Sequence, residues 1–363
     1  MKKGSITVAT ATPYEVRVEP LLDLEAAVSD ALKPGIAVLL TDTNVGPLYA
    51  SSVAEALMEV GWVLAETLMV PAGEGSKSIS VYEGLVRKLA WAKVPRGATL
   101  FALGGGVVGD LGGFVASSYA RGINFVQLPT SLLAMVDSSV GGKVGIDLPE
   151  GKNLIGAFLQ PRLVAANLEW LETLPPREIS HGLAEVVKMS LLAGEEFFED
   201  LVRCLEAARA GDKDALQALI LHSVHFKATI VAEDEREAGL RATLNYGHTI
   251  GHGLEAAASY DLPHGEAIAA GMLAAARLSH KLLGVDLRDI HEDLLRVAGL
   301  PLKVPGVDVK SVLDAMGRDK KRWASDEAGE YRFVLLEDVG RPIRDVPVEV
   351  TEARQAIGTI LES

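Results

Sequence analysis

The hydrophobic pattern of the chain changes near its middle. Up to about residue 168, short runs of β-branched or other apolar residues alternate with stretches that have helical spacing. This alternation predicts a mostly parallel sheet covered by helices on both faces. The predicted strands are 36–41, 62–70, 98–103, 124–130 and 162–167, with helices near 45–60 and 78–93. We therefore expect a doubly wound α/β domain at residues 1–170.

After Pro175 and Pro176 the strand pattern nearly disappears. The remaining chain is rich in Ala and Leu, and its apolar positions recur at helical spacing. The predicted helices are 179–192, 197–210, 214–235, 248–259 and 265–283, and 331–340 is predicted as a strand or hairpin edge. The sequence thus predicts a Rossmann-like domain followed by a mostly α-helical domain at residues 171–363. A cleft between two domains is the default place for a ligand.

Composition and charge narrow the classes of partner. The 363 residues are 48% hydrophobic, which supplies an ample core. With 35 basic and 49 acidic residues the net charge is −14, which disfavours a nucleic-acid partner. The most apolar stretch, at 267–276, is shorter than a membrane span, the start of the chain lacks an apolar signal segment, and Cys204 is the one cysteine. We expect a cytoplasmic protein with no membrane partner.

A glycine loop is the first chemical signal. Gly104, Gly106 and Gly109 form a G-x-G-x-x-G spacing between a predicted strand and a predicted helix. Glycines allow close backbone approach, and a helix N-terminus offers N–H groups to a pyrophosphate, so this context is typical of a dinucleotide site. A tight strand-to-helix turn is the alternative. The usual later acidic residue is missing, and Asp42 is the candidate for the ribose hydroxyls, with helix capping as its alternative.

Histidines and a glutamate are the second signal. His248 and His252 are four residues apart and therefore share a helix face. A zinc-protease motif is disfavoured because a threonine replaces its glutamate. His264 and the pair His181 and Glu185 are further candidates. Spacing leaves the choice among these five open, and a buried, hydrogen-bonded histidine is the alternative for each. Together they favour a divalent metal site with nitrogen and carboxylate ligands.

Cations inside apolar segments are the third signal. A single lysine in such a segment usually extends to solvent. Several of them beside a metal site predict a pocket for an anionic substrate such as a phosphorylated acid. The cations are Lys143, Lys152, Lys188, Lys227 and Arg241.

Taken in order, these motifs resemble those of the 3-dehydroquinate synthase family. The strings are GGGVVGDLGGFVAS, RGINFVQLPTSLLAMVDSSVGGKVGID, GKNLIGAF, EVVK, LNYGHTIGHGLEA and PHGEAIAAGM, and the resemblance runs from Asp42 to the DKK at 319–321. It implies an NAD-binding domain, a helical metal-binding domain and a homodimer. It also implies conversion of 3-deoxy-D-arabino-heptulosonate 7-phosphate, a phosphorylated sugar acid, into 3-dehydroquinate and phosphate in the shikimate pathway.

The resemblance also assigns roles to individual residues. The implied ligands of zinc or cobalt are Glu185, His248 and His264, and His252 becomes a substrate-side or proton-transfer residue. The implied NAD contacts are Asp42, Gly73, Glu74, Lys77, Gly105, Gly106, Val107, Asp110, Thr130, Ser131, Lys143, Lys152 and Thr173. The implied substrate-facing residues are Asp137, Lys152, Asn153, Lys188, Lys227, Arg241 and Asn245. Arg121 is implied to reach the neighbouring subunit's substrate, and either Lys320 or Lys321 is implied to enter the site.

The implied chemistry explains why these residue types occur together. A divalent metal makes the substrate hydroxyls more acidic, NAD accepts and returns a hydride, and the cations stabilise the phosphate as it is eliminated. An intramolecular aldol step then closes the ring, with no net redox change. We expect the cations, with Arg121, to converge on one pocket of an otherwise acidic protein. The alternatives are another sugar phosphate cyclase, an NAD- and metal-dependent polyol dehydrogenase, and a non-catalytic NAD-binding regulator.

Overall fold

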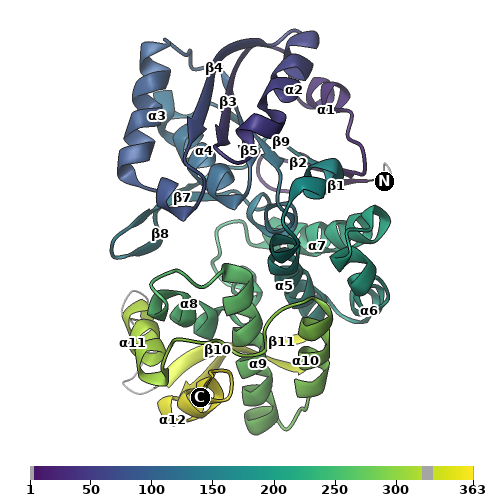
Figure 1. Ribbon diagram of the computed structural model, residues 1–363, viewed down its shortest axis with the longest axis vertical. Coiled ribbons are helices and arrows are strands. Elements are labelled where there is room, and N and C mark those ends of the chain that lie inside the picture. Colours follow the sequence, from purple (N-terminus) through teal and green to yellow (C-terminus); the bar gives the residue numbers. More distant parts are fainter. Residues whose placement is uncertain (1–3, 321–329, 363) are drawn as a thin grey trace. The chain divides into compact units, whose positions relative to one another are not determined.

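The chain folds into two compact units. The computed structural model describes residues 4–320 and 330–362, with only the backbone described at 319 and 320. The first unit comprises Met1–Leu174 and Ile220–Arg236, and the second comprises Pro175–Leu219 and Glu237–Ser363. The division predicted from the sequence, 1–170 and 171–363, does not include the return of 220–236 to the first unit. Figure 1 shows the elements of each unit.

The first unit is built on one seven-stranded sheet in the order β1-β2-β9-β6-β5-β3-β4. Its strands from β2 to β4 pair in parallel, and β1 pairs antiparallel with β2 at one edge. The strands are β1 (Ser5–Val8), β2 (Tyr14–Glu19), β3 (Ile36–Asp42), β4 (Val63–Val70), β5 (Thr99–Gly104), β6 (Asn124–Pro129) and β9 (Leu163–Asn167). The α/β class predicted from the alternating pattern is confirmed.

Helices cover both faces of this sheet. Leu100 and Ala102 of β5 pack with α3 (Ile79–Trp91) and α4 (Gly106–Ser118) in one core cluster. The intervening Phe101 and Leu103 pack instead with α1 (Leu24–Ala31) and α2 (Gly46–Glu59), as the alternation of side chains along a strand requires. Because both faces are buried, the strands read as continuous apolar runs in the sequence.

The sheet has a topological switch point between β3 and β5. From β3 the chain passes through α2 to β4 on one side, and it then returns to β5 on the other side of β3. Ligands of open α/β sheets bind at the carboxyl ends of the strands beside such a point. Asp42 ends β3 and Gly104 ends β5, so both candidates from the sequence lie at this edge.

A hairpin of β7 (Lys143–Leu148) and β8 (Gly151–Phe158), not predicted from the sequence, packs against α4.

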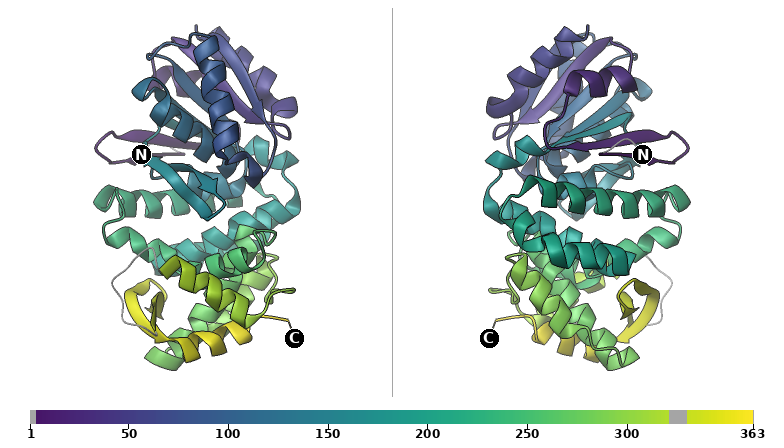
Figure 2. Two further views of the ribbon diagram at one scale, coloured as in Figure 1. Left: turned by 90° about the vertical axis from the view of Figure 1, so that its left-hand side faces the viewer. Right: turned by 90° about the vertical axis from the view of Figure 1, so that its right-hand side faces the viewer.

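The second unit is arranged around one buried helix. Helix α9 (His264–Leu283) contacts α5, α8, α10, α12 and β10 (Figure 2). Its alanines at 267, 269, 270, 274, 275 and 276 are all buried, and such small side chains let neighbours approach it from several sides. The other elements are α5 (Pro176–Ala193), α6 (Glu195–Arg209), α8 (His248–Ala257), α10 (Arg288–Val297), α11 (Val309–Lys320), β10 (Glu330–Asp338), β11 (Arg341–Glu349) and α12 (Val350–Gly358).

Helix α7 (Lys213–Glu233) has the length and mean hydropathy of a membrane span, which was not predicted from the sequence. However, 56% of its most apolar stretch is buried inside the protein, as in the core helix of a soluble protein. Residues 220–233 of this helix belong to the first unit. Length and composition alone are therefore weak evidence for a membrane segment.

Candidate metal centre and nucleotide site

Three helices of the second unit bring a glutamate and two histidines together. Glu185 lies in α5, while His248 and His264 are the first residues of α8 and α9. One ligand atom from each of the three lies within 4.8 Å of the other two. The structure therefore assembles the ligand set that the family resemblance implied, from positions far apart in the sequence.

Glycines allow these helices to approach closely. A Cβ atom at Gly271 of α9 would lie 2.0 Å from the carbonyl oxygen of Gly247, just before α8. A Cβ atom at Gly265 would lie 2.5 Å from the Cα of His181 in α5. Gly247 also has φ 78°, a left-handed conformation that favours glycine. The spacing between the histidines and Glu185 thus depends on glycines that carry no chemistry themselves.

The Glu185 carboxylate is fully buried and incompletely satisfied. Lys188 Nζ forms an ion pair with Oε2 at 2.5 Å, and the Nε2 atoms of His264 and His248 lie 3.5 Å and 3.7 Å from Oε1. Within the described residues, neither oxygen accepts a well-formed hydrogen bond. Buried polar atoms normally have partners. A carboxylate and two imidazole nitrogens facing one point fit a divalent ion such as zinc or cobalt.

The pKa values of this cluster show how strongly its groups interact. Burial alone raises the pKa of Glu185, but Lys188 and the two histidines outweigh it and hold the pKa well below its usual range. Burial and Lys188 lower the pKa of His248. Burial also lowers the pKa of His264, but Glu185 and Glu255 raise it to about 10 overall. The cluster thus keeps Glu185 charged and His248 neutral, as metal ligands must be, whereas a metal ion would have to displace a proton from His264.

Each of the two histidines has a partner on its other ring nitrogen. His248 Nδ1 lies 3.1 Å from the backbone oxygen of Tyr246, and His264 Nδ1 lies 3.5 Å from Glu255 Oε1. A carbonyl oxygen only accepts, so His248 Nδ1 carries the proton and Nε2 is left with its lone pair. Such outer partners orient the ligating nitrogen of a histidine in metal sites. Neither Tyr246 nor Glu255 was among the residues singled out from the sequence.

The remaining two histidine candidates differ from each other. His252 is exposed, and its ring centre lies 5.1 Å from that of His248 and 6.4 Å from that of His264. His181 lies outside the cluster, with Nε2 3.0 Å from Glu266 and Nδ1 3.4 Å from Glu178. Burial lowers the pKa of His181, but these two carboxylates raise it overall. The alternative of a buried, hydrogen-bonded histidine therefore describes His181.

In the first unit, the glycine loop makes the predicted strand-to-helix turn. Gly104 ends β5, and Gly106 begins α4, which no side chain caps among the described residues. Its first N–H groups are therefore free to face an anion. A Cβ atom at Gly109 would lie 2.5 Å from Gln127 Oε1 of β6, so this glycine lets α4 pack on the sheet. The loop has the local geometry of a dinucleotide site.

Asp42 does not cap α2, because Val45 stands at the N-cap position of this helix and no side chain caps it among the described residues. Asp42 Oδ1 accepts hydrogen bonds from the backbone N–H groups of Asn44 and Val45, at 2.8 Å and 2.9 Å. These bonds shape the turn that leads into α2. A ribose contact remains a prediction for this carboxylate.

A buried lysine connects three segments of the first unit. Lys77 Nζ lies 2.9 Å from Asp110 of α4 and 2.5 Å from the amide oxygen of Asn153 in the β7–β8 hairpin. Glu74 and Asp147 lie 3.4 Å and 3.9 Å from the same nitrogen. Burial alone lowers the pKa of Lys77, but the carboxylates raise it, and burial raises the pKa of Asp110. We call these five residues the Lys77 network.

A second ion pair in the first unit joins α7 to a short π-helical turn at Ala134–Ser138. Lys227 Nζ donates to the backbone oxygen and to Oδ1 of Asp137, at 2.6 Å and 2.7 Å. Lys227 is buried. It therefore does not extend to solvent as an isolated lysine usually does.

The other predicted site residues are distributed between the two units. Arg121 is exposed on a turn where Ala120 and Arg121 have φ 50° and 67°. Arg241 is buried beside an exposed Asn245 in the second unit. In the first unit, the buried or half-buried residues are Val107, Thr130, Ser131 and Lys152, and the exposed ones are Gly73, Lys143 and Thr173. Lys321 and the side chain of Lys320 lie outside the described residues.

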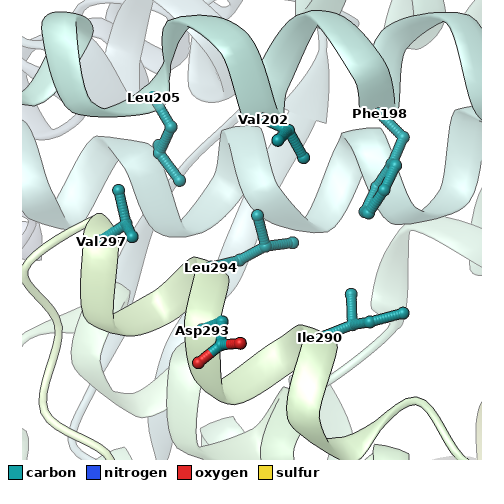
Figure 3. Close-up of a pocket in the computed structure, with 7 residues that line it drawn as sticks. All are labelled: Phe198, Val202, Leu205, Ile290, Asp293, Leu294 and Val297. Atoms are coloured by element: carbon teal, nitrogen blue, oxygen red, sulfur yellow. The ribbon is translucent and has the colours of Figure 1, made fainter.

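The second unit also has an apolar groove away from the metal cluster. It has a volume of about 260 Å³ and lies between α6 and α10 (Figure 3). Asp293 is the one titratable residue among its lining residues, which are Phe198, Val202, Leu205, Ile290, Asp293, Leu294 and Val297. The groove therefore lacks the groups that the proposed chemistry needs.

The first unit has a parallel sheet with a glycine loop at its switch point, and the second is a helical unit with a Glu-His-His cluster. Together they define a class of two-unit proteins that have the geometry of a nucleotide site in one unit and of a metal site in the other. Residues 67–181 match the family "3-dehydroquinate synthase N-terminal", and residues 182–322 match "3-dehydroquinate synthase C-terminal". A 3-dehydroquinate synthase of Acidithiobacillus ferrooxidans is 44% identical over 340 residues, covering 91% of each chain. The chain belongs to the 3-dehydroquinate synthase family.

Two solved structures are similar over almost the whole chain. One is 2-deoxy-scyllo-inosose synthase with carbaglucose-6-phosphate, NAD⁺ and Co²⁺, at 27% identity and a TM-score of 0.88, covering 97% of this chain and 99% of that one. The other is 2-epi-5-epi-valiolone synthase from Streptomyces hygroscopicus subsp. jinggangensis 5008 with NAD⁺ and Zn²⁺. It is 26% identical with a TM-score of 0.86, covering 96% of each chain.

Proposed function

We propose that this chain converts 3-deoxy-D-arabino-heptulosonate 7-phosphate into 3-dehydroquinate and phosphate, with NAD and one zinc or cobalt ion as cofactors. The relative from Acidithiobacillus ferrooxidans, at 44% identity over 91% of the chain, carries the assignment. The two solved cyclases contain NAD⁺ with Co²⁺ or Zn²⁺, which supports the cofactors. The Glu185 cluster is the observation in this chain that supports a metal ion.

Glu185, His248 and His264 are the residues proposed to hold the metal. Glu185 supplies a carboxylate kept charged by Lys188, and the two histidines supply Nε2 atoms that face it. Two protein nitrogens and one carboxylate leave coordination positions open for substrate oxygens, as catalytic sites of this kind do. Glu255 orients the ring of His264, and the Tyr246 carbonyl orients the ring of His248.

The carboxyl edge of the sheet in the first unit is proposed to bind NAD. The uncapped start of α4 and the glycine loop suit the pyrophosphate. Asp42 is proposed for the ribose, with its second oxygen available beyond the turn that the first one shapes. Gly73, Glu74, Lys77, Gly105, Gly106, Val107, Asp110, Thr130, Ser131, Lys143, Lys152 and Thr173 complete the proposed set.

The substrate is an anion, and the proposed contacts are mostly cations and amides. Three of the cations are buried, so bulk water screens their charge less than it would at the surface. They are Lys188, Lys227 and Arg241. Asp137 anchors Lys227 at 2.7 Å and so fixes where that charge lies. Lys152, Asn153 and Asn245 are proposed to bind the hydroxyl and carboxylate groups, and the exposed His252 is proposed to move a proton.

When bound, a divalent metal supplies Lewis-acid polarisation of hydroxyl oxygens, and NAD supplies a hydride acceptor and donor. The chain's residues supply position and charge. The Lys188 and Lys227 ammonium groups stabilise the charge that develops on the departing phosphate. His252 accepts and returns a proton through its imidazole. Because the hydride is returned, NAD is expected to be regenerated in each turnover.

The product balance tests this proposal. Purified protein with NAD⁺, cobalt or zinc, and the heptulosonate phosphate should release one phosphate for each dehydroquinate formed, without steady accumulation of NADH. A polyol dehydrogenase would instead accumulate NADH. Another sugar phosphate cyclase would release phosphate from a different sugar phosphate, such as a hexose 6-phosphate, and not from the heptulosonate phosphate. Either result rejects the proposed substrate.

Arg121 is proposed to act on the substrate of the partner subunit in a homodimer. Its exposure and its left-handed backbone conformation, which strains a residue other than glycine, are consistent with such a role. Mixing inactive Arg121→Ala with inactive His264→Ala tests it, because each mixed dimer then holds one intact site. Recovery of about a quarter of the normal activity is expected for random mixing. No recovery would show that Arg121 acts within its own subunit.

The cytoplasmic location remains a prediction, consistent with the free thiol of Cys204.

A further inference from the structure

A buried histidine of the second unit has no part in the proposed mechanism. His291 in α10 is 0% exposed, and so is its neighbour Tyr246, which precedes Gly247 at the start of α8. A fully buried histidine needs partners for both ring nitrogens. Its position far from the metal-site motifs in the sequence gives no hint of a connection with them.

Both ring nitrogens of His291 are used. Nδ1 lies 2.7 Å from the backbone oxygen of Leu287, and Nε2 lies 2.7 Å from the hydroxyl of Tyr246. Because a carbonyl oxygen only accepts, Nδ1 carries the proton and Nε2 accepts from the Tyr246 hydroxyl. The tautomer of His291 thus fixes both the direction of the Tyr246 hydrogen bond and the place of its ring.

The same Tyr246 holds a proposed metal ligand through its backbone. Its carbonyl oxygen accepts from His248 Nδ1 at 3.1 Å, which leaves the lone pair of Nε2 on the side of Glu185. Gly247 joins the two residues with φ 78°, and a Cβ atom there would lie 2.8 Å from Met272 Cγ. The turn is therefore tightly packed, and a displacement of the Tyr246 ring has little room to relax without moving its carbonyl group.

We infer that His291 is a positioning residue for the metal ligand His248 and that it acts through Tyr246. The chain of contacts runs from the Leu287 carbonyl through His291 and the Tyr246 side chain to the Tyr246 carbonyl and His248. The inference rests on the proposed function, because it assumes that His248 binds a metal. It adds a residue of α10 to the support of a site built from α5, α8 and α9.

The test measures metal binding as well as activity. Tyr246→Phe and His291→Asn both remove the hydrogen bond between the two side chains, and Asn retains a donor near the position of Nδ1. Each should weaken cobalt binding in a chelator competition by about 3- to 10-fold, less than the loss of a direct outer partner. Each should also shift the visible spectrum of the Co²⁺-loaded protein. Tyr331→Phe is the control, because its hydroxyl donates to the Leu313 carbonyl elsewhere in the same unit.

A rescue variant separates positioning from a general loss of structure. His291→Gln places an amide oxygen near Nε2 and can still accept from Tyr246, so it should restore most of the cobalt affinity and spectrum. Combining Tyr246→Phe with His291→Asn should add little to either change alone, since both remove one hydrogen bond. A loss of cobalt affinity in His291→Gln as large as that in His291→Asn, or an equally large loss in the control Tyr331→Phe, would overturn the inference. If the unaltered protein binds no cobalt or zinc, the proposed metal site itself fails. If it binds normally and all variants match it, only the role of His291 fails.

Discussion

Lys77 of the first unit and Lys188 of the second are both buried lysines that face carboxylates, but their partners differ. Lys77 Nζ lies within 4 Å of three carboxylates and donates to the amide oxygen of Asn153 as a fourth partner. Lys188 forms an ion pair with Glu185, whose oxygens accept no well-formed hydrogen bond in the described part of the chain. The first arrangement is complete without a ligand. The second has unused ligand capacity.

This difference separates two uses of buried charge. The Lys77 network joins α4, the turn at Glu74 and the β7–β8 hairpin, so we expect it to hold the shape of the nucleotide site. The Glu185 cluster is expected to gain its missing interactions from a metal ion. The pKa directions of the two carboxylates also differ, because burial dominates at Asp110 and leaves its pKa raised, while neighbouring cations dominate at Glu185 and leave its pKa lowered. The following changes test that contrast.

Glu185→Gln should have the largest effect. The amide keeps the shape of the side chain but removes the charge that attracts a cation between His248 and His264. Loss of the metal removes several kcal/mol of stabilisation, so phosphate release should fall by about 1,000-fold or more. The metal content of the purified protein checks the cause. Glu199→Gln, an exposed change on α6, is the control, and a Glu185→Gln protein with full metal content would contradict the assignment.

Lys77→Met should affect the other region. It leaves Asp110 and Asp147 without their buried cation, and breaking such a pair costs about 3–5 kcal/mol. The hairpin should lose its polar connection to α4, and NAD binding measured by calorimetry should weaken by about 10- to 100-fold, given that cost. Cobalt affinity should not change, because the Glu185 cluster lies in the other unit. Lys88→Met, an exposed change on α3, serves as control. A parallel loss of cobalt affinity would show that the two regions are not independent.

Glu255→Gln should have a smaller effect than the loss of Glu185. Glu255 is 2% exposed and faces His264 Nδ1 at 3.5 Å, so it orients the ring without touching the metal. Removing such a carboxylate typically lowers metal affinity by about 10-fold. Chelator competition with cobalt measures it, and rates at saturating cobalt should recover. If the affinity is unchanged, the Glu185 cluster does not depend on this outer partner.

The fold could be predicted largely from the sequence because its apolar runs match the buried strands. The predicted strands 36–41 and 98–103 correspond to β3 and β5, and the predicted helix 265–283 corresponds to α9. The β7–β8 hairpin was missed. Its β8 strand is mostly half-buried or exposed and carries the proposed site residues Lys152 and Asn153. The strand therefore lacks the apolar alternation from which a strand is predicted. The N-terminal pair β1 and β2 was also not recognised.

The metal cluster could be predicted only in part from spacing. Five candidate ligands remained, because spacing along a helix does not show which distant helices meet. Glu266 and Glu178 engage His181, and close packing at Gly265 brings α9 against α5. These contacts depend on tertiary structure. The family resemblance indicated Glu185, His248 and His264, and the structure brings these three together, although their role as ligands still rests on the proposed experiments.

Mild acid should reveal the smallest difference between the units. Burial lowers the pKa of His291 to about 4, below its ordinary value of 6.5, so the unfolded chain binds a proton that the folded chain excludes. The stabilising contribution is therefore present above pH 6.5 and is lost as the pH falls toward 4. Between pH 6.5 and 5.5 the second unit should lose about 1 kcal/mol.

Hydrogen exchange of backbone amides in α10 and in β5 measures this loss separately for each unit. His291→Gln removes the titrating group and should reduce the acid sensitivity of α10 while leaving that of β5 unchanged. The comparison between the two proteins cancels the pH dependence of metal binding, which both share. Equal acid sensitivity of α10 in the two proteins would mean that other groups of the second unit set its response to pH.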